Sequence, residues 1–178
     1  SVFVLRWDGE NSITQSSVLP MKGVPDENLR SLPMLPVPTT ELAGVLIGEK
    51  IYLTGGNSGK GETKIFWMLD LTQREKGKGK FQWRNLEAWN GPARTHHLAV
   101  EHHDGFEKCL FIFSGREQAK GQWVLHRDAH KYSPKKKKWT KLRDISVKGE
   151  EEARCVMAGT VVAWGANHVL VFGGAGGE

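Results

Sequence analysis

The sequence predicts an all-β fold made of repeated four-stranded units, and three observations support this prediction. Three short apolar segments end on small residues, namely 51–56 (IYLTGG), 110–115 (LFIFSG) and 169–174 (VLVFGG). The glycines that close them are 59 residues apart in both intervals, from 56 to 115 and from 115 to 174. The segments between them are short and separated by turn residues, without a helical period. A fixed period of this length indicates a repeat architecture.

Each unit is expected to contain four antiparallel strands, A to D, with the small-residue signature at the end of strand B. Strand A corresponds to 43–47, 97–101 and 156–162, strand C to 64–70 and 128–134, and strand D to 81–86 and 139–142. A polar loop is expected after Gly115. The tryptophan at the start of strand D can fill the wedge between neighbouring sheets. Because one sheet cannot bury both of its faces alone, the units are expected to stack around an axis as a β-propeller.

All 178 residues are expected to belong to one propeller domain. Residues 1–19 have the pattern of a β-hairpin around the turn 8–11 (DGEN). We therefore assign 1–20 to the outer strands of a preceding blade, 35–89 and 90–144 to two blades, and 150–178 to the first two strands of a further blade. Propellers have about 4–8 blades, so this partial propeller of about three blades is expected to need further blades that lie outside this chain.

The amino-acid composition and charge limit the classes of protein to which this chain can belong. Hydrophobic residues make up 39% of the chain, and 21 glycines and seven tryptophans fit a turn-rich β protein. No apolar stretch of 18 residues occurs, so no membrane partner is expected. The net charge of +5 is concentrated in lysine-rich turns that lack interleaved aromatic residues, so no nucleic-acid partner is expected. Residues 1–7 have the pattern of a strand, and no signal segment is expected in this chain.

The cysteines and a cluster of histidines leave two alternatives open. Cys109 and Cys155 are expected to be small buried side chains, with a disulfide between them as the alternative. Four histidines, at 96, 97, 102 and 103, are potential metal ligands. Two histidines six residues apart on a strand are roughly 20 Å apart, however, so we expect no metal site.

Candidate binding residues gather at one end of the predicted units, because the loops before strand A and after strand B emerge from the same end. The candidates are Glu41, Arg94, Thr95 and Arg154 before strand A, and Asn57, Arg116 and Glu117 after strand B. We expect them near the mouth of the central channel. Arginines there suit an anionic small ligand, because a guanidinium binds a carboxylate through two hydrogen bonds. The alternative is that the arginines bridge neighbouring blades through ion pairs and loop carbonyls.

The combination of an apolar strand, two small residues, a tyrosine-containing strand and a tryptophan resembles the kelch repeat. Six segments are also similar to the opening blades of the sialic acid mutarotase (N-acetylneuraminate epimerase) family. The likeness covers about residues 35–174, and these segments are 35–38 (LPVP), 51–56 (IYLTGG), 69–70 (LD), 91–94 (GPAR), 128–134 (DAHKYSP) and 139–142 (WTKL). The hairpin that precedes this opening is similar to the cyclically permuted branch of the family. Ser114-Gly115 departs mildly from the usual pair of glycines.

The resemblance implies a six-bladed ring when complete and a general acid/base reaction that interconverts the α and β anomers of sialic acid. It implies an anionic sugar as substrate, no metal or nucleotide cofactor, and a periplasmic or secreted location. Glu117 is the candidate acid/base by position, whereas the catalytic glutamate of the family belongs to a later blade, beyond Glu178. The alternative function is a non-catalytic kelch propeller that binds a glycan or a protein partner.

Overall fold

A computed structural model of the chain describes residues 2–7, 13–19, 32–76, 81–145 and 155–175. The chain divides into two compact units, Ser1–Pro36 and Val37–Glu178, which are described separately. Within the described ranges, no helix has the length and apolar character needed to cross a membrane.

The first unit contains an antiparallel hairpin. Strand β1 (Val2–Trp7) pairs with β2 (Ile13–Leu19), and the register shifts between Val4 and Leu5. The two strands confirm the expected hairpin, while its turn at 8–11 lies outside the described residues. Its assignment to a preceding blade of the same propeller stays a prediction.

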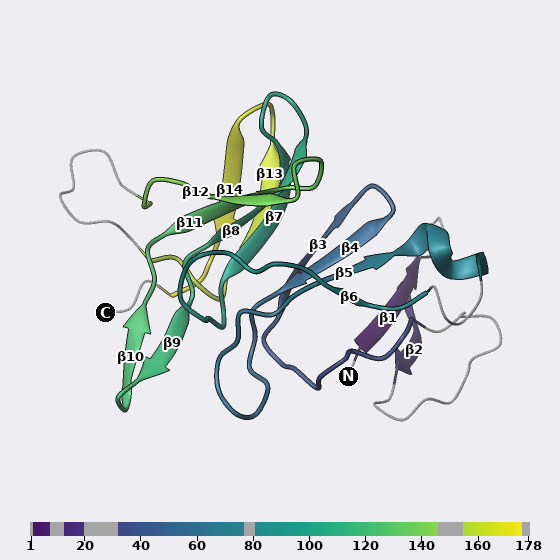
Figure 1. The fold of residues 1–178 in the computed structure, drawn as a ribbon, viewed down its shortest axis with the longest axis horizontal. Helices are drawn as coiled ribbons and strands as arrows, with labels where there is room; N and C mark the ends of the chain where they lie inside the picture. The colour runs from purple at the N-terminus through teal and green to yellow at the C-terminus, as the bar shows by residue number, and fades with distance from the viewer. Residues whose placement is uncertain (1, 8–12, 20–31, 77–80, 146–154, 176–178) are drawn as a thin grey trace. The chain divides into compact units, whose positions relative to one another are not determined.

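The second unit contains two four-stranded antiparallel sheets whose strands follow one another in chain order (Figure 1). The first sheet consists of β3 (Ala43–Ile47), β4 (Lys50–Thr54), β5 (Phe66–Asp70) and β6 (Arg84–Asn85), with the 3₁₀ helix η1 (Leu71–Lys76) after β5. The second consists of β7 (Leu98–His103), β8 (Lys108–Phe113), β11 (Ala129–Ser133) and β12 (Lys138–Lys141). These are the expected strands A to D, although the fourth strand of the first sheet is only two residues long.

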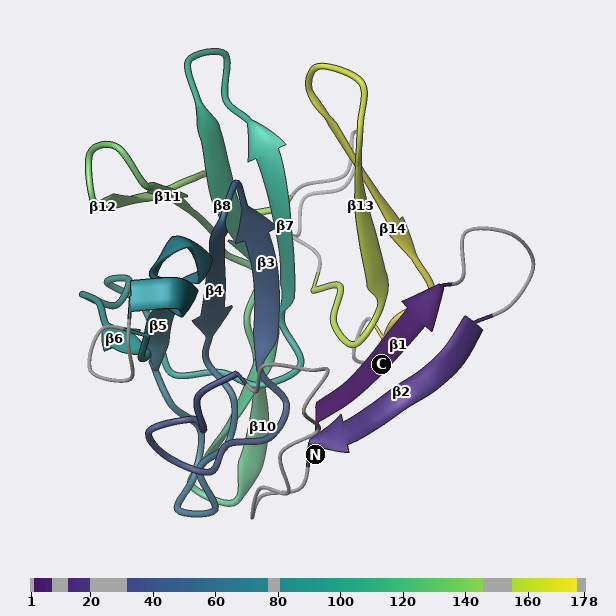
Figure 2. The same cartoon turned by 90° about the vertical axis from the view of Figure 1, so that its right-hand side faces the viewer.

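A third, two-stranded sheet follows, formed by β13 (Thr160–Trp164) and β14 (His168–Phe172). The first strands of the three sheets, β3, β7 and β13, lie side by side (Figure 2). This arrangement of inner strands, with each sheet extending outward from them, is that of a partial β-propeller.

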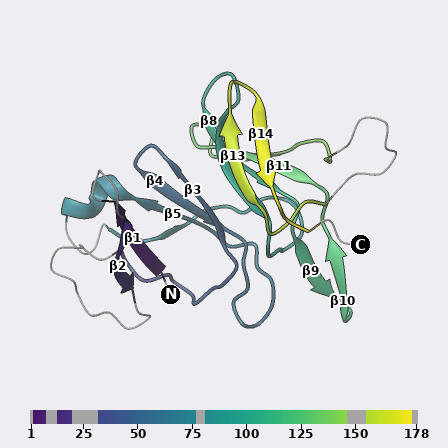
Figure 3. The ribbon, with the colours of Figure 1, turned by 180° about the vertical axis from the view of Figure 1, so that it is seen from behind.

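Besides η1, a two-stranded hairpin was not predicted. Where a polar loop was expected after Gly115, the chain forms a hairpin of β9 (Arg116–Ala119) and β10 (Gln122–Leu125). Figure 3 shows it extending as a two-stranded arm beyond the end of β8. Its turn residues, Lys120 and Gly121, both have positive φ (51° and 79°), as a two-residue hairpin turn requires. The Lys-Gly pair followed by QWVL was the signal in the sequence.

The core lies between the two four-stranded sheets and is largely aromatic. Phe66 from β5 packs edge-on against Tyr132 from β11 and against Trp139 from β12, with ring centroids 4.7 and 4.9 Å apart. Trp139 also contacts Trp89, which is fully buried. The indole N–H of Trp139 donates to the carbonyl of Glu87 at 3.0 Å. Trp139 therefore fills the wedge between neighbouring sheets, as expected for the tryptophan at the start of strand D.

The small-residue signature is explained by a close backbone contact. At the second position of each signature, a Cβ atom would lie within 3 Å of a carbonyl oxygen in the loop before strand A of the same sheet. For Gly115 this oxygen belongs to Thr95, at 2.8 Å, and φ is +100°. The first position differs between repeats: a Cβ at Gly55 would lie 2.7 Å from the carbonyl oxygen of Arg94, whereas one at Gly173 would meet nothing within 4 Å. In the second repeat Ser114 takes this position with φ 55°, and its buried hydroxyl accepts a hydrogen bond from the amide of Val156 at 3.0 Å. Ser114 thus replaces glycine and adds a link to the next repeat.

This contact predicts different effects for two glycine substitutions in the intact protein. Gly115→Ala should lower the free energy of unfolding by about 2–4 kcal/mol, because the new Cβ meets the Thr95 carbonyl in a strained conformation. Gly121→Ala is the matched control, because it also has positive φ but has nothing within 4 Å, and it should cost about 1 kcal/mol. Both values can be measured by guanidinium unfolding. Equal losses would show that the close contact does not restrict position 115.

Candidate functional site

The loops before strand A and after strand B meet at one end of the sheets. In each of the three repeats a single antiparallel bridge joins them. The bridges are Thr40–Asn57, Thr95–Arg116 and Met157–Ala175. The amide of Thr95, for example, donates to the carbonyl of Arg116 at 2.9 Å, and the reverse bond is 3.0 Å long. The same structural device thus recurs at the same end of every repeat.

Hydrogen bonds between repeats join these loops to one another. The amide of Gly56 donates to the carbonyl of Arg94 at 2.9 Å, and the amide of Ala158 donates to the carbonyl of His96 at 2.8 Å. The loops therefore form a continuous end surface across the three repeats. Arg154, the seventh candidate residue, lies outside the described residues.

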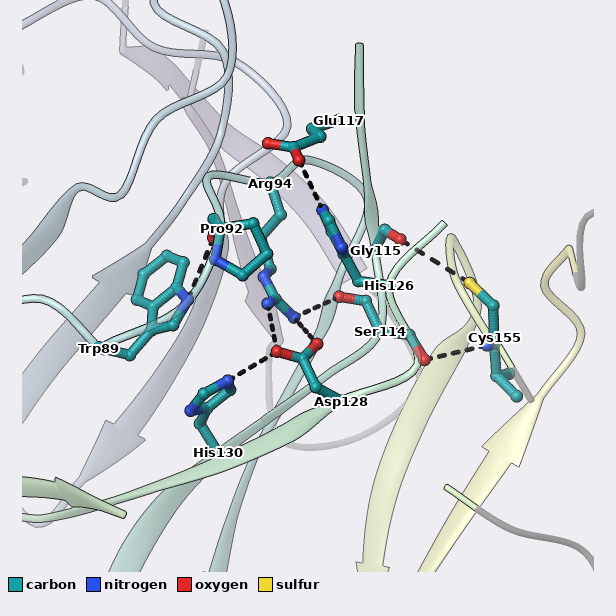
Figure 4. Close-up of polar contacts among 11 residues, drawn as sticks. Trp89, Pro92, Arg94, Ser114, Gly115, Glu117, His126, Asp128, His130 and Cys155 are labelled. Atoms are coloured by element: carbon teal, nitrogen blue, oxygen red, sulfur yellow. Dashed lines mark hydrogen bonds and ion pairs between the residues drawn. The ribbon is translucent and has the colours of Figure 1, made fainter. Parts of the chain in front are cut away.

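Arg94 is part of the interior and does not line a pocket. Its side chain is fully buried, and its guanidinium binds both carboxylate oxygens of Asp128 at 2.8 Å (Figure 4). One nitrogen also donates to the carbonyl of Ser114 at 2.7 Å, and the guanidinium carbon lies 5.6 Å from the ring centroid of Trp89. The expectation that Arg94 binds substrate is therefore corrected, because Asp128 and a loop carbonyl already occupy its guanidinium. The alternative, an arginine that bridges neighbouring blades, is met only in the kind of contact, an ion pair and a loop carbonyl, because Asp128 and Ser114 belong to the same repeat as Arg94.

Asp128 is the centre of a buried polar cluster. Besides Arg94, the Nε2 atom of His130 lies 2.7 Å from its carboxylate. Burial alone would raise the pKa of Asp128, but the hydrogen bonds and positive charges of His130 and Arg94 outweigh burial and hold this pKa well below its usual range. Trp89, whose indole N–H donates to the carbonyl of Pro92 at 3.2 Å, lies beside the cluster (Figure 4). The cluster fixes the loop before β7 against β11.

Glu117 lies on β9 at the accessible side of this cluster. Its carboxylate is 28% exposed and lies 3.8 Å from Nε2 of His126, which follows β10 and is buried (Figure 4). The pKa of His126 is lowered by burial and by the charge of Arg94, and the charges of Glu117 and Asp128 only partly offset these effects. The pair combines an accessible carboxylate with an imidazole, which are the groups used for proton transfer near neutral pH.

Arg116 is a candidate arginine whose guanidinium could still bind an anionic ligand. Its guanidinium carbon stacks over the ring of Trp123 from β10, 3.9 Å from the centroid, and half of the Trp123 side chain is exposed. Among the described residues it forms no ion pair with a carboxylate. A guanidinium held on an aromatic face keeps its charge and its donors for an anion.

The other candidates lie at the same end with different degrees of exposure. Thr95 is buried in the bridge to Arg116. The side-chain oxygen of Asn57 accepts a hydrogen bond from the amide of Gly59 at 2.8 Å, so this side chain stabilises its own loop. Glu41 is exposed and lies 3.6 Å from Nδ1 of His96. Sequence reasoning missed Asp128, His126 and His96 as parts of this end, since no repeat pattern marks them.

His97 and the two cysteines are buried in the interior of the protein. His97 is buried, and its Nε2 lies 2.8 Å from the hydroxyl of Thr54. Burial, and then the charges of Arg94 and His96, lower the pKa of His97 to about 3. Cys109 and Cys155 are both free and buried rather than joined in a disulfide, and burial raises the pKa of Cys109 to about 12. In the described ranges, no three His, Cys, Asp or Glu side chains are grouped as metal ligands would be.

The sheets and their end loops define the class of protein: this chain is part of a kelch-type β-propeller. The model of the N-acetylneuraminate epimerase family matches residues 32–178. The chain belongs to this family.

Individual relatives agree with this assignment. The N-acetylneuraminate epimerase of Haemophilus influenzae (strain PittEE) is 29% identical over 123 residues, which cover 68% of this chain and 29% of that protein. The N-acetylneuraminate epimerase of Pasteurella multocida (strain Pm70) is 31% identical over 129 residues, with 71% and 30% covered. The propeller structure of YjhT has a TM-score of 0.50 at 23% identity, with 73% of this chain and 36% of that chain covered. This chain thus spans about three tenths of the length of these two epimerases.

The Arg94–Asp128 pair predicts a large effect of charge removal. Asp128→Asn should lower the free energy of unfolding by about 3–5 kcal/mol, because it leaves a buried guanidinium without its counter-charge. The double variant Arg94→Met/Asp128→Leu should be less destabilised, since neither charge remains. Lys108→Met, in an exposed pair with Glu101, is the control and should change stability by about 1 kcal/mol or less. Unfolding of the intact protein in guanidinium measures all three, and a loss below 1 kcal/mol for Asp128→Asn would contradict the interpretation.

His97 predicts a loss of stability in mild acid. Its folded pKa of about 3 lies below the usual value of 6.5, so between these values the unfolded chain binds a proton that the folded chain does not. Stability present above pH 6.5 is therefore lost as the pH falls, by up to ~1.4 kcal/mol per pH unit. His97→Gln should weaken this dependence between pH 7 and pH 5, whereas the exposed control His168→Gln should keep it. An unchanged slope in His97→Gln would assign the acid sensitivity to other groups.

Proposed function

We propose that the protein containing this chain is a sialic acid mutarotase, an isomerase that interconverts the α and β anomers of N-acetylneuraminate. The observation that carries this proposal is the family match across residues 32–178, which includes all the loops at the candidate end. The residues at that end support the proposal, because they offer an uncommitted guanidinium and an accessible carboxylate on the same strand, β9.

The proposed chemistry follows from the two kinds of group. Arg116 would bind the carboxylate of the sugar through its guanidinium donors, with the Trp123 ring holding it in place. Opening of the sugar ring needs a proton on the ring oxygen and removal of the proton from the anomeric hydroxyl, and closure needs the reverse. Glu117 is the proposed acid/base in this chain, and His126 beside it supports its orientation. Further blades outside this chain would supply the rest of the pocket.

Two finer points belong to the same proposal. The family match begins at residue 32, after the β1–β2 hairpin, which supports a cyclically permuted order of strands in which this hairpin belongs to another blade. Family resemblance is also the basis for proposing that the protein works in the periplasm or outside the cell.

The test is the rate of anomeric exchange of N-acetylneuraminate, measured by NMR on the intact protein. Wild type should accelerate exchange above the spontaneous rate. Glu117→Gln should lower kcat by about 10²-fold, and Arg116→Met should mainly raise KM. Glu49→Gln, an exposed glutamate in the turn between β3 and β4, is the control and should behave as wild type.

The opposite result has a clear meaning. If wild type does not accelerate exchange, the mutarotase proposal is wrong for this sugar. If it nevertheless binds N-acetylneuraminate, the alternative of a non-catalytic propeller that binds a glycan is favoured.

A further inference from the structure

The β9–β10 hairpin is not required by the repeat. In the first sheet, the equivalent connection between β4 and β5 covers residues 55–65 and contains only isolated bridges. In the second sheet, residues 114–128 connect β8 to β11 and form the hairpin (Figure 3). The hairpin thus adds side chains to the candidate end beyond those that the repeat itself places there.

Backbone hydrogen bonds fix the base of this hairpin. The amide of Arg116 donates to the carbonyl of Thr95 at 3.0 Å, and the amide of His126 donates to the carbonyl of Gly115 at 2.8 Å. A tight turn closes the other end of the hairpin. Because the hairpin is held at both ends, its side chains are presented in a defined arrangement, which lowers the entropic cost of binding a ligand.

Three side chains of different chemistry share one face of the hairpin. In an antiparallel pair, directly opposite residues project to the same face, and so do residues two apart along a strand. Trp123 is directly opposite Gln118, and Arg116 lies two residues before Gln118. The Arg116 guanidinium accordingly stacks over the Trp123 ring at 3.9 Å. We call these three side chains the Trp123 face.

The Trp123 face is accessible. Half of the Trp123 side chain is exposed, and Gln118 is exposed as well. A single exposed tryptophan can occur on any protein surface. This one, however, lies beside a guanidinium whose Nε has no hydrogen-bond partner among the described residues, and opposite an exposed amide. The face therefore offers a positive charge, an apolar surface, and a hydrogen-bond donor and acceptor.

An N-acylated acidic sugar presents the matching groups. Its carboxylate is the anion that a guanidinium binds through two hydrogen bonds. Its N-acyl group combines a methyl group, which packs on an aromatic ring, with an amide that pairs with the carboxamide of Gln118. A simple carboxylic acid would leave Trp123 and Gln118 without contacts, and a neutral sugar would leave Arg116 without its anion.

We propose that the Trp123 face recognises an N-acylated acidic sugar. Arg116 holds the carboxylate, while Trp123 and Gln118 select the N-acyl group and so determine specificity. This inference rests on the proposed function, which supplies the identity of the sugar as N-acetylneuraminate. The recognition does not depend on which residue transfers the proton, so a catalytic glutamate from a later blade is compatible with it.

Binding of methyl glycosides tests recognition apart from reaction, because a glycoside cannot open its sugar ring. Both anomeric methyl glycosides of N-acetylneuraminate are titrated into the intact protein by isothermal titration calorimetry. They are compared with the matching glycosides in which a hydroxyl group replaces the N-acetylamino group. For the anomer that binds more tightly, wild type should prefer the N-acetyl glycoside by at least about tenfold in Kd.

Variants of the Trp123 face should change this preference in different ways. Gln118→Ala and Trp123→Leu should each reduce it to about threefold or less. Trp123→Phe keeps an aromatic ring beside the guanidinium and should give a preference between those of wild type and Trp123→Leu. Arg116→Met should weaken the binding of both kinds of glycoside by about tenfold and keep the preference between them.

The opposite face of the same strand provides matched controls. Gln122 and Val124 are exposed, and they alternate with Trp123 along β10, so they project away from the Trp123 face. Gln122→Ala removes an amide, as Gln118→Ala does, and Val124→Ala removes an apolar side chain. Both variants should stay within about twofold of wild type in affinity and in preference.

Four results would overturn the inference. It is wrong if wild type binds neither N-acetyl glycoside, if it binds both kinds of glycoside equally, if Arg116→Met binds as tightly as wild type, or if Gln122→Ala loses the preference as Gln118→Ala does. Failure of the proposed function is a different result. Wild type would then keep its preference for the N-acetyl glycoside without accelerating anomeric exchange, and the Trp123 face would be the glycan-binding site of a non-catalytic propeller.

Discussion

The contact between the end of strand B and the loop before strand A is the constraint on which the rest of this structure depends. The carbonyl of Thr95 lies so close to Gly115 that no side chain fits between them, and the same contact recurs at Gly56 and Gly174. A backbone bridge lies beside this contact in each repeat, and the residue that follows the bridge residue before strand A has a left-handed φ. Glu41 and His96 occupy this position in two neighbouring repeats, and the Glu41 carboxylate lies 3.6 Å from Nδ1 of His96.

Two kinds of interaction then join the repeats. Aromatic packing of Phe66, Tyr132 and Trp139 fills the wedge between the first two sheets with apolar area. At the candidate end, polar and directional hydrogen bonds cross between repeats, from the amide of Gly56 to the Arg94 carbonyl and from the amide of Ala158 to the His96 carbonyl. The apolar contacts hold the sheets together, whereas the polar contacts determine which loop residues face outward. A rigid scaffold beneath accessible loops is the usual setting for a binding site.

The repeat period and the apolar alternation were sufficient to predict the sheets, because strand order in this fold follows chain order. The family could also be predicted from the sequence, chiefly from residues 128–134 (DAHKYSP) and the segment 139–142 that follows. The role of Arg94 could not be predicted, because the sequence does not distinguish a buried arginine from an exposed one. Its partner Asp128 is also 34 residues away in the chain. The β9–β10 hairpin was missed because its residues are polar, with arginine, glutamate and lysine masking the alternation of a strand. His96 was missed because φ, not residue type, makes its position unusual.

Ser114 shows how such a repeat can diverge without losing its geometry. In the second repeat the first small residue is a serine in the left-handed conformation, and its hydroxyl accepts a hydrogen bond from the amide of Val156. The second must be glycine, because a carbonyl oxygen occupies the space of its Cβ. A search pattern that weights both positions equally would therefore miss divergent repeats of this kind. A pattern anchored on the second glycine, with glycine or serine allowed before it, would still detect them.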